Sequence, residues 1–496
     1  MTDFAGHNLC TEIELAVPFW RCAELFPATE SAFLLDSGLD PARLGRYSYV
    51  GGRPSALLTG RRMGPDTLEM DLKLQTWRRP DGQLLLEPRI DAFQGDPFVA
   101  LRDLAAKYPV GPDAPSGEHA VPFASGLVGC FGYETAYAIE KLPSTGTDDL
   151  GLPEMAFMVV DEVLVHDHTR QQTFLLVTGR GAQAAQQAAQ RTAAWQADLA
   201  ALSAKAPLVV NVEAKKAPVR AHFDRQQYKA AVEQCRQHIL AGDVFEVCLT
   251  QRLEMDLPGT AWDLYGVLRA INPAPFAAYL QFPDFQVVSA SPERFLQLGA
   301  DGAAESRPIK GTRPRGATPA EDARLKAELG SAEKDLAENI MIVDLVRNDL
   351  GKVCRIGSVS VPELQVVESY ATVHQLVSTV RGELKPEYDA FDLVRACFPG
   401  GSMTGAPKIE AMKIIDSIEP VKRGVYSGAL GFIAAGGAMD LGMVIRTVVC
   451  QNGIATFGVG GAVVSDSDPD AEYEETMDKA RAMITAISAL SNGGAA

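Results

Sequence analysis

The 496-residue chain lacks several features that would place it in other classes of protein. None of its eight cysteines forms a Cys-x-x-Cys pair, so their spacing indicates neither a zinc site nor a dithiol redox motif. The N-terminus has no basic stretch followed by an apolar one, as a secretion signal would. No apolar run reaches the roughly 18 residues of a membrane span. We therefore expect a cytoplasmic protein with free thiols and no membrane contact.

Positive charge is also scarce. Lysine and arginine number 46 against 63 aspartates and glutamates, for a formal net charge of −17. A field of this sign repels nucleic acid, so we expect no nucleic-acid partner. If the ligand is an anion, a local cluster of cations or a metal ion must attract it. The 47% of apolar residues is ordinary for a globular protein with a sizeable core.

The first region, residues 1–205, reads mainly as strands separated by glycine and proline. Residues 156–179 predict a hairpin with its polar turn at 166–171. The Ala- and Gln-rich segment 181–204 predicts one surface helix, because its leucines and tryptophan form an apolar stripe. Residues 205–223 mix proline and lysine with a short apolar run, and we interpret them as the crossing to a second region.

The second region, residues 224–492, mixes strands and helices. It begins with an amphipathic helix for which Asp224 is a suitable N-cap and Gly242 a suitable C-terminal stop. The last helix is expected to start at Pro469 with Asp468 as its cap. The pattern alone therefore predicts a mixed α and β fold.

Two acidic pairs occur at helical spacing. Asp335 and Glu338 lie three residues apart, as do Glu472 and Glu475, so each pair shares a helix face. Carboxylates on two helices offer oxygen ligands of the kind that Mg²⁺ takes beside an anionic substrate. The alternative is that both faces are solvated, with Glu475 and Lys479 forming an ordinary i, i+4 ion pair.

Glu293 and Lys310 lie in a segment that reads as two strands joined by a turn at 300–302. A turn centred there would place the two side chains almost opposite each other, about 5 Å apart at Cβ. Such a pair combines an acid with a nucleophile or base. A one-residue slip would separate them, and a plain cross-strand ion pair is the alternative.

Two segments are rich in glycine. In 398–408, "FPGGSMTGAPK", Ser402 and Thr404 add donors to a backbone that could approach an anion closely. The segment lacks the Gly-Lys-Ser/Thr ending of a P-loop, so a nucleotide site is disfavoured; a plain turn before a helix capped near Thr404 is the alternative. The run "FGVGGAVV", 457–464, indicates either close approach to a ligand or a bulge.

Two single residues stand out. Arg446 interrupts the apolar run "MVIRTVV", so its cation either binds a carboxylate or points to water. His374 is isolated in "TVHQLVST", and such a histidine is more often structural than catalytic.

Many of these segments, taken in order, resemble the chorismate-utilising enzymes. The resemblance covers most of 224–492, and the matching segments are "AGDVFEVCLTQR", "SPERF", "RPIKGT", "DLAENIMIVDLVRNDLG", "PGGSMTGAPK", "YSGALGF", "IRT" and "EYEETMDKA". A weaker match in the first region includes "LLDS", "RYSYVG" and "GLVGCFGYE". The resemblance implies a large α+β unit of two packed, mainly antiparallel sheets with flanking helices.

Within the family, Lys310 resembles the aminodeoxychorismate-forming branch, since anthranilate synthases generally carry alanine there. This implies conversion of chorismate and ammonia to 4-amino-4-deoxychorismate, for p-aminobenzoate and folate biosynthesis. The alternatives are anthranilate synthase component I, which makes anthranilate and pyruvate for tryptophan biosynthesis, and a non-catalytic amino-acid-binding regulator on the same scaffold.

The resemblance also implies roles for individual residues. Lys310 is the expected nucleophile and Glu293 the general acid, which requires a lowered pKa for the lysine and a raised one for the glutamate. The expected Mg²⁺ ligands are Glu338 and Glu475, with Asp335 and Glu472 nearby. The expected substrate-binding residues are Arg446, Lys479, Tyr426, Ser402, Thr404, Gly458, Gly460 and Gly461.

Two positions depart from the family pattern. Glu246 stands where relatives often have Gln, or Lys in members that add water. The family's histidine usually precedes Leu-Val-Ser directly, where this chain has Gln375, so a catalytic role for His374 is disfavoured.

No Cys lies in a Gly-x-Cys-x-Gly elbow, so we expect ammonia from a separate glutamine amidotransferase subunit or from solution.

Overall fold

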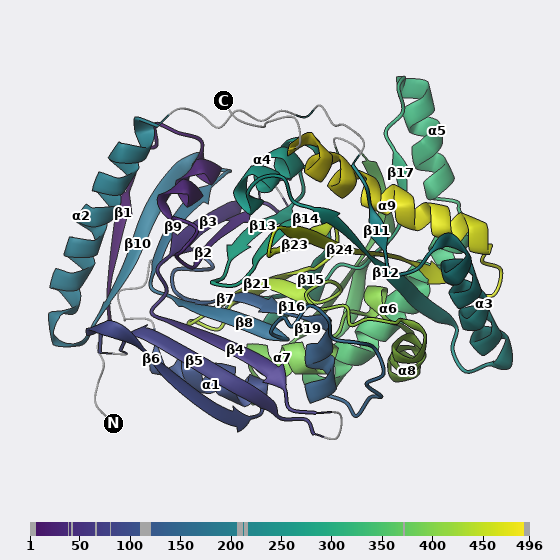
Figure 1. Cartoon of the computed structure of the whole chain (residues 1–496), viewed down its shortest axis with the longest axis horizontal. Helices are drawn as coiled ribbons and strands as arrows, with labels where there is room; N and C mark the ends of the chain where they lie inside the picture. Colours follow the sequence, from purple (N-terminus) through teal and green to yellow (C-terminus); the bar gives the residue numbers. More distant parts are fainter. Residues whose placement is uncertain are drawn as a thin grey trace.

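The computed structural model describes residues 6–37, 39–40, 43–64, 67–79, 81–109, 121–205, 212, 217–370 and 373–490. Within this part of the chain, two twelve-stranded antiparallel sheets form the centre of the molecule, and helices flank them (Figure 1). This confirms the fold class that the resemblance implied. Most of the predicted crossing at 205–223 lies outside the described residues.

The first sheet has the order β1 (Gly6–Glu12), β10 (Gln172–Arg180), β9 (Glu162–Asp167), β3 (Tyr47–Gly52), β2 (Ala32–Asp36), β13 (Phe276–Gln281), β14 (Gln286–Ser291), β23 (Thr447–Gln451), β24 (Ile454–Val463), β12 (Glu246–Asp256) and β11 (Arg220–Ala221), with β20 (Gly405–Ala406) also on β12.

The second sheet has the order β17 (Ile309–Pro314), β19 (Val373–Glu383), β16 (Ala303–Ser306), β15 (Arg294–Leu298), β22 (Met439–Met443), β21 (Ala429–Ala434), β7 (Gly126–Phe131), β8 (Met155–Val160), β4 (Ala56–Arg62), β5 (Met70–Arg78) and β6 (Leu84–Gly95), with β18 (Ser360–Ser369) also on β19.

The α-helices are α1 (Pro97–Lys107), α2 (Ala184–Ser203), α3 (Arg225–Ala241), α4 (Ala261–Ile271), α5 (Pro319–Leu329), α6 (Glu333–Val353), α7 (Ala390–Cys397), α8 (Lys408–Ile418) and α9 (Pro469–Leu490). Short 3₁₀ turns are η1 (Phe19–Leu25), η3 (Tyr133–Ala138), η4 (Gly181–Gln183) and η5 (Gly401–Met403). No described helix combines the length and apolar content needed to cross a bilayer.

Both sheets take strands from each side of the division at 205–224. In the first sheet β2 pairs with β13, and in the second β7 pairs with β21. The predicted regions 1–205 and 224–492 thus contribute strands to the same two sheets. The division of the chain into these two regions stays a prediction. The hairpin predicted within 156–179 is present as β9 and β10. The first part of that segment lies in β8, which belongs to the second sheet.

The core lies in layers set by strand alternation. Between the sheets, Phe33 and Leu280 of the first pack with Val128 and Phe432 of the second. Outside the first sheet, α2, α4 and α9 bury a second apolar layer, and outside the second sheet α1, α6 and α7 bury a third. The helices therefore cover the outer faces of both sheets, and α6 and α9 also border the cavity described below.

The predicted helix ends are confirmed. The Asp224 side chain accepts from the backbone of Gln227, and Gly242 ends α3 with φ of 86°, which glycine adopts without strain. Asp468 accepts from two backbone N–H groups at the start of α9, beside Pro469. This cap fixes the first turn of α9, which contains Glu472; Glu475 lies one turn further along.

Candidate active site

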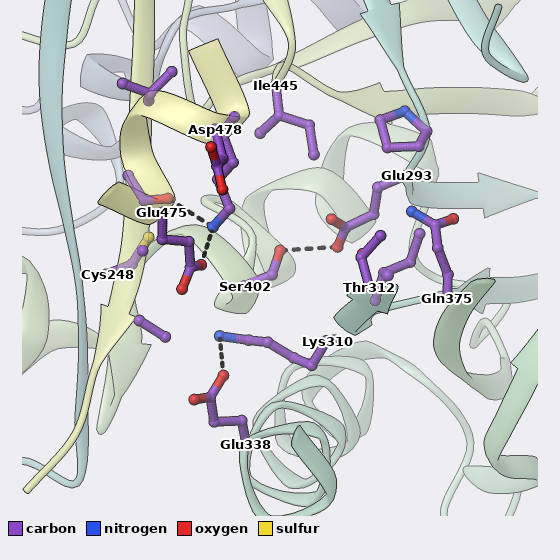
Figure 2. Close-up of a pocket in the computed structure, with 18 of the residues that line it drawn as sticks. Cys248, Glu293, Lys310, Thr312, Glu338, Gln375, Ser402, Ile445, Glu475 and Asp478 are labelled. Carbon is purple, nitrogen blue, oxygen red and sulfur yellow. Dashed lines mark hydrogen bonds and ion pairs between the residues drawn. The ribbon is translucent and has the colours of Figure 1, made fainter. Parts of the chain in front are cut away.

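A cavity of about 700 Å³ lies where β12 and β24 of the first sheet approach β17 of the second. Helices α6 and α9 and the loop around η5 complete its wall. Figure 2 shows Lys310, Glu338, Glu293 and Glu475 turned toward the same space from four different segments. A cavity of this size accommodates one small organic molecule.

Lys310 reaches this cavity from β17. Its side chain is 8% exposed, and its Nζ donates to Glu246 Oε1 at 2.5 Å and lies 3.8 Å from Glu338 Oε2. Gly311, with φ of 87°, lets the strand approach α6, because a Cβ there would lie 2.8 Å from Asp335 Cγ. The lysine is thus a buried cation facing the acidic helices and not a solvated turn residue.

The predicted lowering of the Lys310 pKa is wrong for this structure. Burial lowers the pKa of Lys310, but the carboxylates of Glu246 and Glu338 outweigh burial and raise it above its usual value. Without a ligand, the lysine therefore carries its proton.

Glu293 lies just before β15, with its carboxylate in the cavity wall. Ser402 Oγ donates to Glu293 Oε1 at 2.9 Å, as Figure 2 shows. Burial raises the pKa of Glu293 to about 7, against the opposing effects of Ser402 and Lys310. The direction of this shift agrees with the raised pKa expected for this residue.

The predicted pairing of Glu293 with Lys310 across a hairpin is wrong, although the turn at 300–302 is present. β15 pairs with β16, but β17 pairs with β19, so the strand expected after the turn is divided at 307–308. The proline at 308 has no N–H to continue the ladder. Both side chains line the cavity, Lys310 from β17 and Glu293 from the loop before β15, and these two strands are not neighbours.

Glu338 on α6 and Glu475 on α9 face the cavity together. Burial raises the pKa of Glu338 to about 7, although Lys310 opposes it. Burial also acts on Glu475, but the Lys479 ammonium at 2.7 Å outweighs it and lowers the Glu475 pKa. Lys334 lies between the helices, 3.9 Å from Glu338 Oε1. Charged groups of both signs therefore alternate across the site.

The other two predicted acidic residues differ in environment. Asp335 lines the cavity and accepts from Arg313 at 3.0 Å. Glu472 is 2% exposed beside the cavity, and its Oε1 accepts from Ser467 at 2.7 Å and Lys334 at 3.2 Å. Its Oε2 has no hydrogen-bond partner among the described residues. The alternative of two solvated acidic faces is wrong for Glu338 and Glu472.

The predicted acidic set does not form a closed ligand shell. Among the described residues, three acidic or ligating side chains come within 4.8 Å of one another only at Asp149, His222 and Glu254. These residues lie outside the cavity, and Arg252 contacts both Asp149 and His222.

Arg446 supplies an unpaired cation. It lies between β22 and β23 with φ of 51°, so it links two strands and does not interrupt one. Its side chain lines the cavity, and no described residue forms a hydrogen bond or ion pair with its guanidinium. Burial lowers its pKa. An unpaired, half-buried guanidinium is a suitable site for a carboxylate.

The glycine run on β24 forms a flat part of the wall. The pairing with β12 is continuous from Val247 to Asp256, so the alternative of a bulge is wrong. A Cβ at Gly458 would lie 2.1 Å from Tyr426 Cδ1, so only glycine fits beside that ring. Gly460 and Gly461 also line the cavity, and the Gly460 carbonyl accepts from Lys479 at 2.8 Å.

The glycine-rich loop 398–408 contributes less than predicted. Ser402 lines the cavity, but Thr404 Oγ1 donates to the carbonyls of Gly400 and Gly401 at 3.3 Å and does not line it. The following helix starts at Lys408, so the predicted cap near Thr404 is wrong. Lys408 pairs with Asp349 at 2.6 Å, which leaves no P-loop lysine for a phosphate.

Residues 374 and 375 show strand alternation. Gln375 lines the cavity, whereas the fully buried His374 contacts Ser369 at 2.8 Å and Asp322 at 3.0 Å on the other side.

Two cations of the site, Lys334 and Arg313, were not predicted from the sequence, although they pair with the acidic residues. For Lys334 a signal existed, since it precedes Glu338 by four residues.

The fold and cavity define a class of protein: two large antiparallel sheets that, with flanking helices, enclose a cavity lined by charged side chains of both signs. The family model described as chorismate binding enzyme matches residues 76–485. The chain therefore belongs to the chorismate binding enzyme family.

Curated relatives include two kinds of enzyme. The chain is 51% identical to an aminodeoxychorismate synthase of Streptomyces pristinaespiralis, over 74% of this chain and 51% of that one. It thus spans about half the length of that relative. It is 40% identical to aminodeoxychorismate synthase component 1 of Klebsiella aerogenes, over 90% and 92% of the two chains. It is 39% identical to anthranilate synthase component 1 of Streptomyces coelicolor, over 95% and 86%.

A solved structure has the same fold. Anthranilate synthase component I from Streptococcus pneumoniae superposes with a TM-score of 0.73 at 30% identity, over 88% of this chain and 92% of that one.

Proposed function

We propose that the chain converts chorismate and ammonia to 4-amino-4-deoxychorismate. The observation that carries this proposal is Lys310, a buried amine that shares one cavity with the protonatable Glu293 and the acidic helices. Identity to aminodeoxychorismate synthases, at 51% and 40%, supports the same choice.

The proposed reaction has two displacements. Lys310 Nζ, as the neutral amine, attacks ring carbon 2, both ring double bonds shift, and the 4-hydroxyl leaves as water with the proton of Glu293. Ammonia then adds at carbon 4, both double bonds shift back, the lysine leaves carbon 2 as a neutral amine, and the added nitrogen returns a proton to Glu293. The net reaction consumes chorismate and ammonia and releases water. Before the first step Lys310 must lose the proton that Glu246 and Glu338 stabilise.

Further residues of the wall bind the substrate carboxylates in this proposal. Arg446, as an unpaired cation, binds one carboxylate bidentately. Lys479 and the backbone of Gly460 and Gly461 bind the other, and Tyr426 supports the ring.

We also propose Mg²⁺ as the cofactor, held by Glu338 and Glu475 with Glu472 and Asp335 nearby. The donor set fits: all four are carboxylates on two facing helices, and the buried Oε2 of Glu472 has no partner among the described residues. The Lys334 ammonium lies within ion-pair distance of Glu338 and Glu472, so a positive charge already balances these carboxylates at the proposed metal site. The ion would supply charge neutralisation at a substrate carboxylate.

A separate glutamine amidotransferase subunit is the proposed ammonia source, as the name component 1 of the Klebsiella aerogenes relative suggests. All eight cysteines are free thiols, which fits the proposed cytoplasmic location. The partner is tested by measuring glutamine-dependent amination with and without the added subunit.

The function is tested by mass spectrometry of the product formed from chorismate, Mg²⁺ and ammonium. We expect a non-aromatic amino acid that retains its enolpyruvyl group, with no pyruvate released. Lys310→Ala is expected to abolish product formation while chorismate still binds; unchanged turnover in that variant would disprove the nucleophile role.

A second candidate is anthranilate synthase component I, favoured by the 39% identity that extends over 95% of this chain. In the same assay it would release pyruvate and a fluorescent aromatic amine. A non-catalytic regulator is disfavoured, because Glu293, Lys310, Glu338 and Glu475 all line one cavity.

A further inference from the structure

Glu246 is a buried carboxylate with a single task in this structure. It is 0% exposed, its Oε1 accepts from Lys310 Nζ at 2.5 Å, and its Oε2 has no partner among the described residues. Burying a carboxylate costs several kcal/mol unless its partner compensates. Since it bonds no other described group, its side chain acts through Lys310.

The backbone of Glu246 pairs with one neighbouring strand, and that of the next residue, Val247, pairs with strands on both sides. Glu246 is the first residue of β12, which pairs with β24 from Val247 onward, and itself pairs with Ala406 of β20. The close approach of the neighbouring strand is visible at Gly405, where a Cβ would lie 2.1 Å from the Glu246 carbonyl oxygen. The carboxylate therefore projects from a rigid support in the first sheet.

Lys310, by contrast, belongs to the second sheet and carries its amine on a flexible four-carbon stem. The bond to Glu246 is the one hydrogen bond that its Nζ forms with the described residues. Glu338 Oε2, at 3.8 Å, is too far for a hydrogen bond. Without Glu246 no described group would fix the amine.

We propose that Glu246 is a positioning residue, whose carboxylate oxygen holds the Lys310 amine at the place from which it attacks the ring. This inference rests on the proposed function of Lys310. It requires an acceptor oxygen at this point and not a negative charge as such. A displacement of about 1 Å in a reacting group lowers turnover about 100-fold.

Three variants separate oxygen placement from charge. Glu246→Gln keeps an acceptor oxygen in place without charge, Glu246→Asp keeps the charge but withdraws the oxygen by one methylene, and Glu246→Met keeps the volume without an acceptor. Asp161→Asn is the matched control, because Asp161 is also buried and pairs with Arg180 at 2.5 Å, outside the cavity.

Turnover is measured with chorismate, saturating ammonium and Mg²⁺, beside melting temperatures. We expect kcat within about fivefold of wild type for Glu246→Gln, about 10-fold lower for Glu246→Asp and about 100-fold lower for Glu246→Met. The KM for chorismate should change less than about twofold in all three, and the control should keep its kcat even if its melting temperature falls.

Wild-type turnover in Glu246→Met, or an active Asp variant beside an inactive Gln variant, would overturn the inference. If Glu246→Met does not fold, the Gln and Asp variants decide. Crystal structures give a readout that is independent of activity: Nζ should stay in place in Glu246→Gln and move by about 1 Å in Glu246→Asp. If Nζ does not move in Glu246→Asp, the inference is refuted, whatever the wild type produces. If the wild type makes no aminodeoxychorismate, only the proposed function is refuted.

Discussion

Removing the Lys310 cation should destabilise the fold. In Lys310→Met, Glu246 keeps its burial but loses the group to which its Oε1 is bonded. Removing one partner of a buried ion pair leaves an uncompensated buried charge and typically costs about 3–5 kcal/mol. We expect a loss of this size in the free energy of unfolding.

Urea unfolding of wild type and Lys310→Met at pH 7, with a chelator to exclude metal, measures this loss.

The double variant Lys310→Met with Glu246→Gln is the control, since its amide carries no charge. It should recover most of the lost stability. A double variant as unstable as Lys310→Met would refute the view that the buried charge of Glu246 relies on Lys310.

Three further predictions concern the cavity. With a Glu293 pKa of about 7, kcat/KM should fall tenfold per unit as pH rises above 7, because the general acid loses its proton, and a flat pH–rate profile would exclude that role. Gly458→Ala should prevent chorismate binding, because its methyl group would displace the Tyr426 ring that lines the cavity; calorimetric titration with chorismate tests this, and the melting temperature should fall because the ring is buried. Arg446→Ala should raise the chorismate KM about 10- to 100-fold, as expected for the loss of a charge-assisted hydrogen bond, and an unchanged KM would place the carboxylate elsewhere.

Local features of the fold could be predicted from the sequence because they depend on neighbouring residues. The caps at Asp224 and Asp468, and the shared helix face of Glu472 and Glu475, follow from spacing and were found where expected. The two-sheet architecture came from the resemblance and not from any local pattern. The order of the strands, in which β2 lies beside β13, depends on contacts between residues more than 200 positions apart.

The candidate site could be predicted as a list of residues but not as a set of contacts. The expected hairpin from Glu293 to Lys310 failed because Pro308 divides the second strand, and both parts pair with β19. The contact between Glu246 and Lys310 joins the two sheets, so no periodicity within one strand could indicate it. The error on the Lys310 pKa has the same origin, because it depends on carboxylates brought in from other elements.

The charges of the site give a separate reason to expect a cation with the substrate. Lys310, Lys334 and Lys479 each lie within ion-pair distance of a carboxylate, so little of their positive charge is left for a ligand. Among the described wall residues Arg446 is the cation without such a partner. One guanidinium does not balance two carboxylates of a dianion in a protein of net charge −17. A divalent ion between α6 and α9 would restore that balance, and it would free Lys310 from Glu338 while leaving its bond to Glu246 intact.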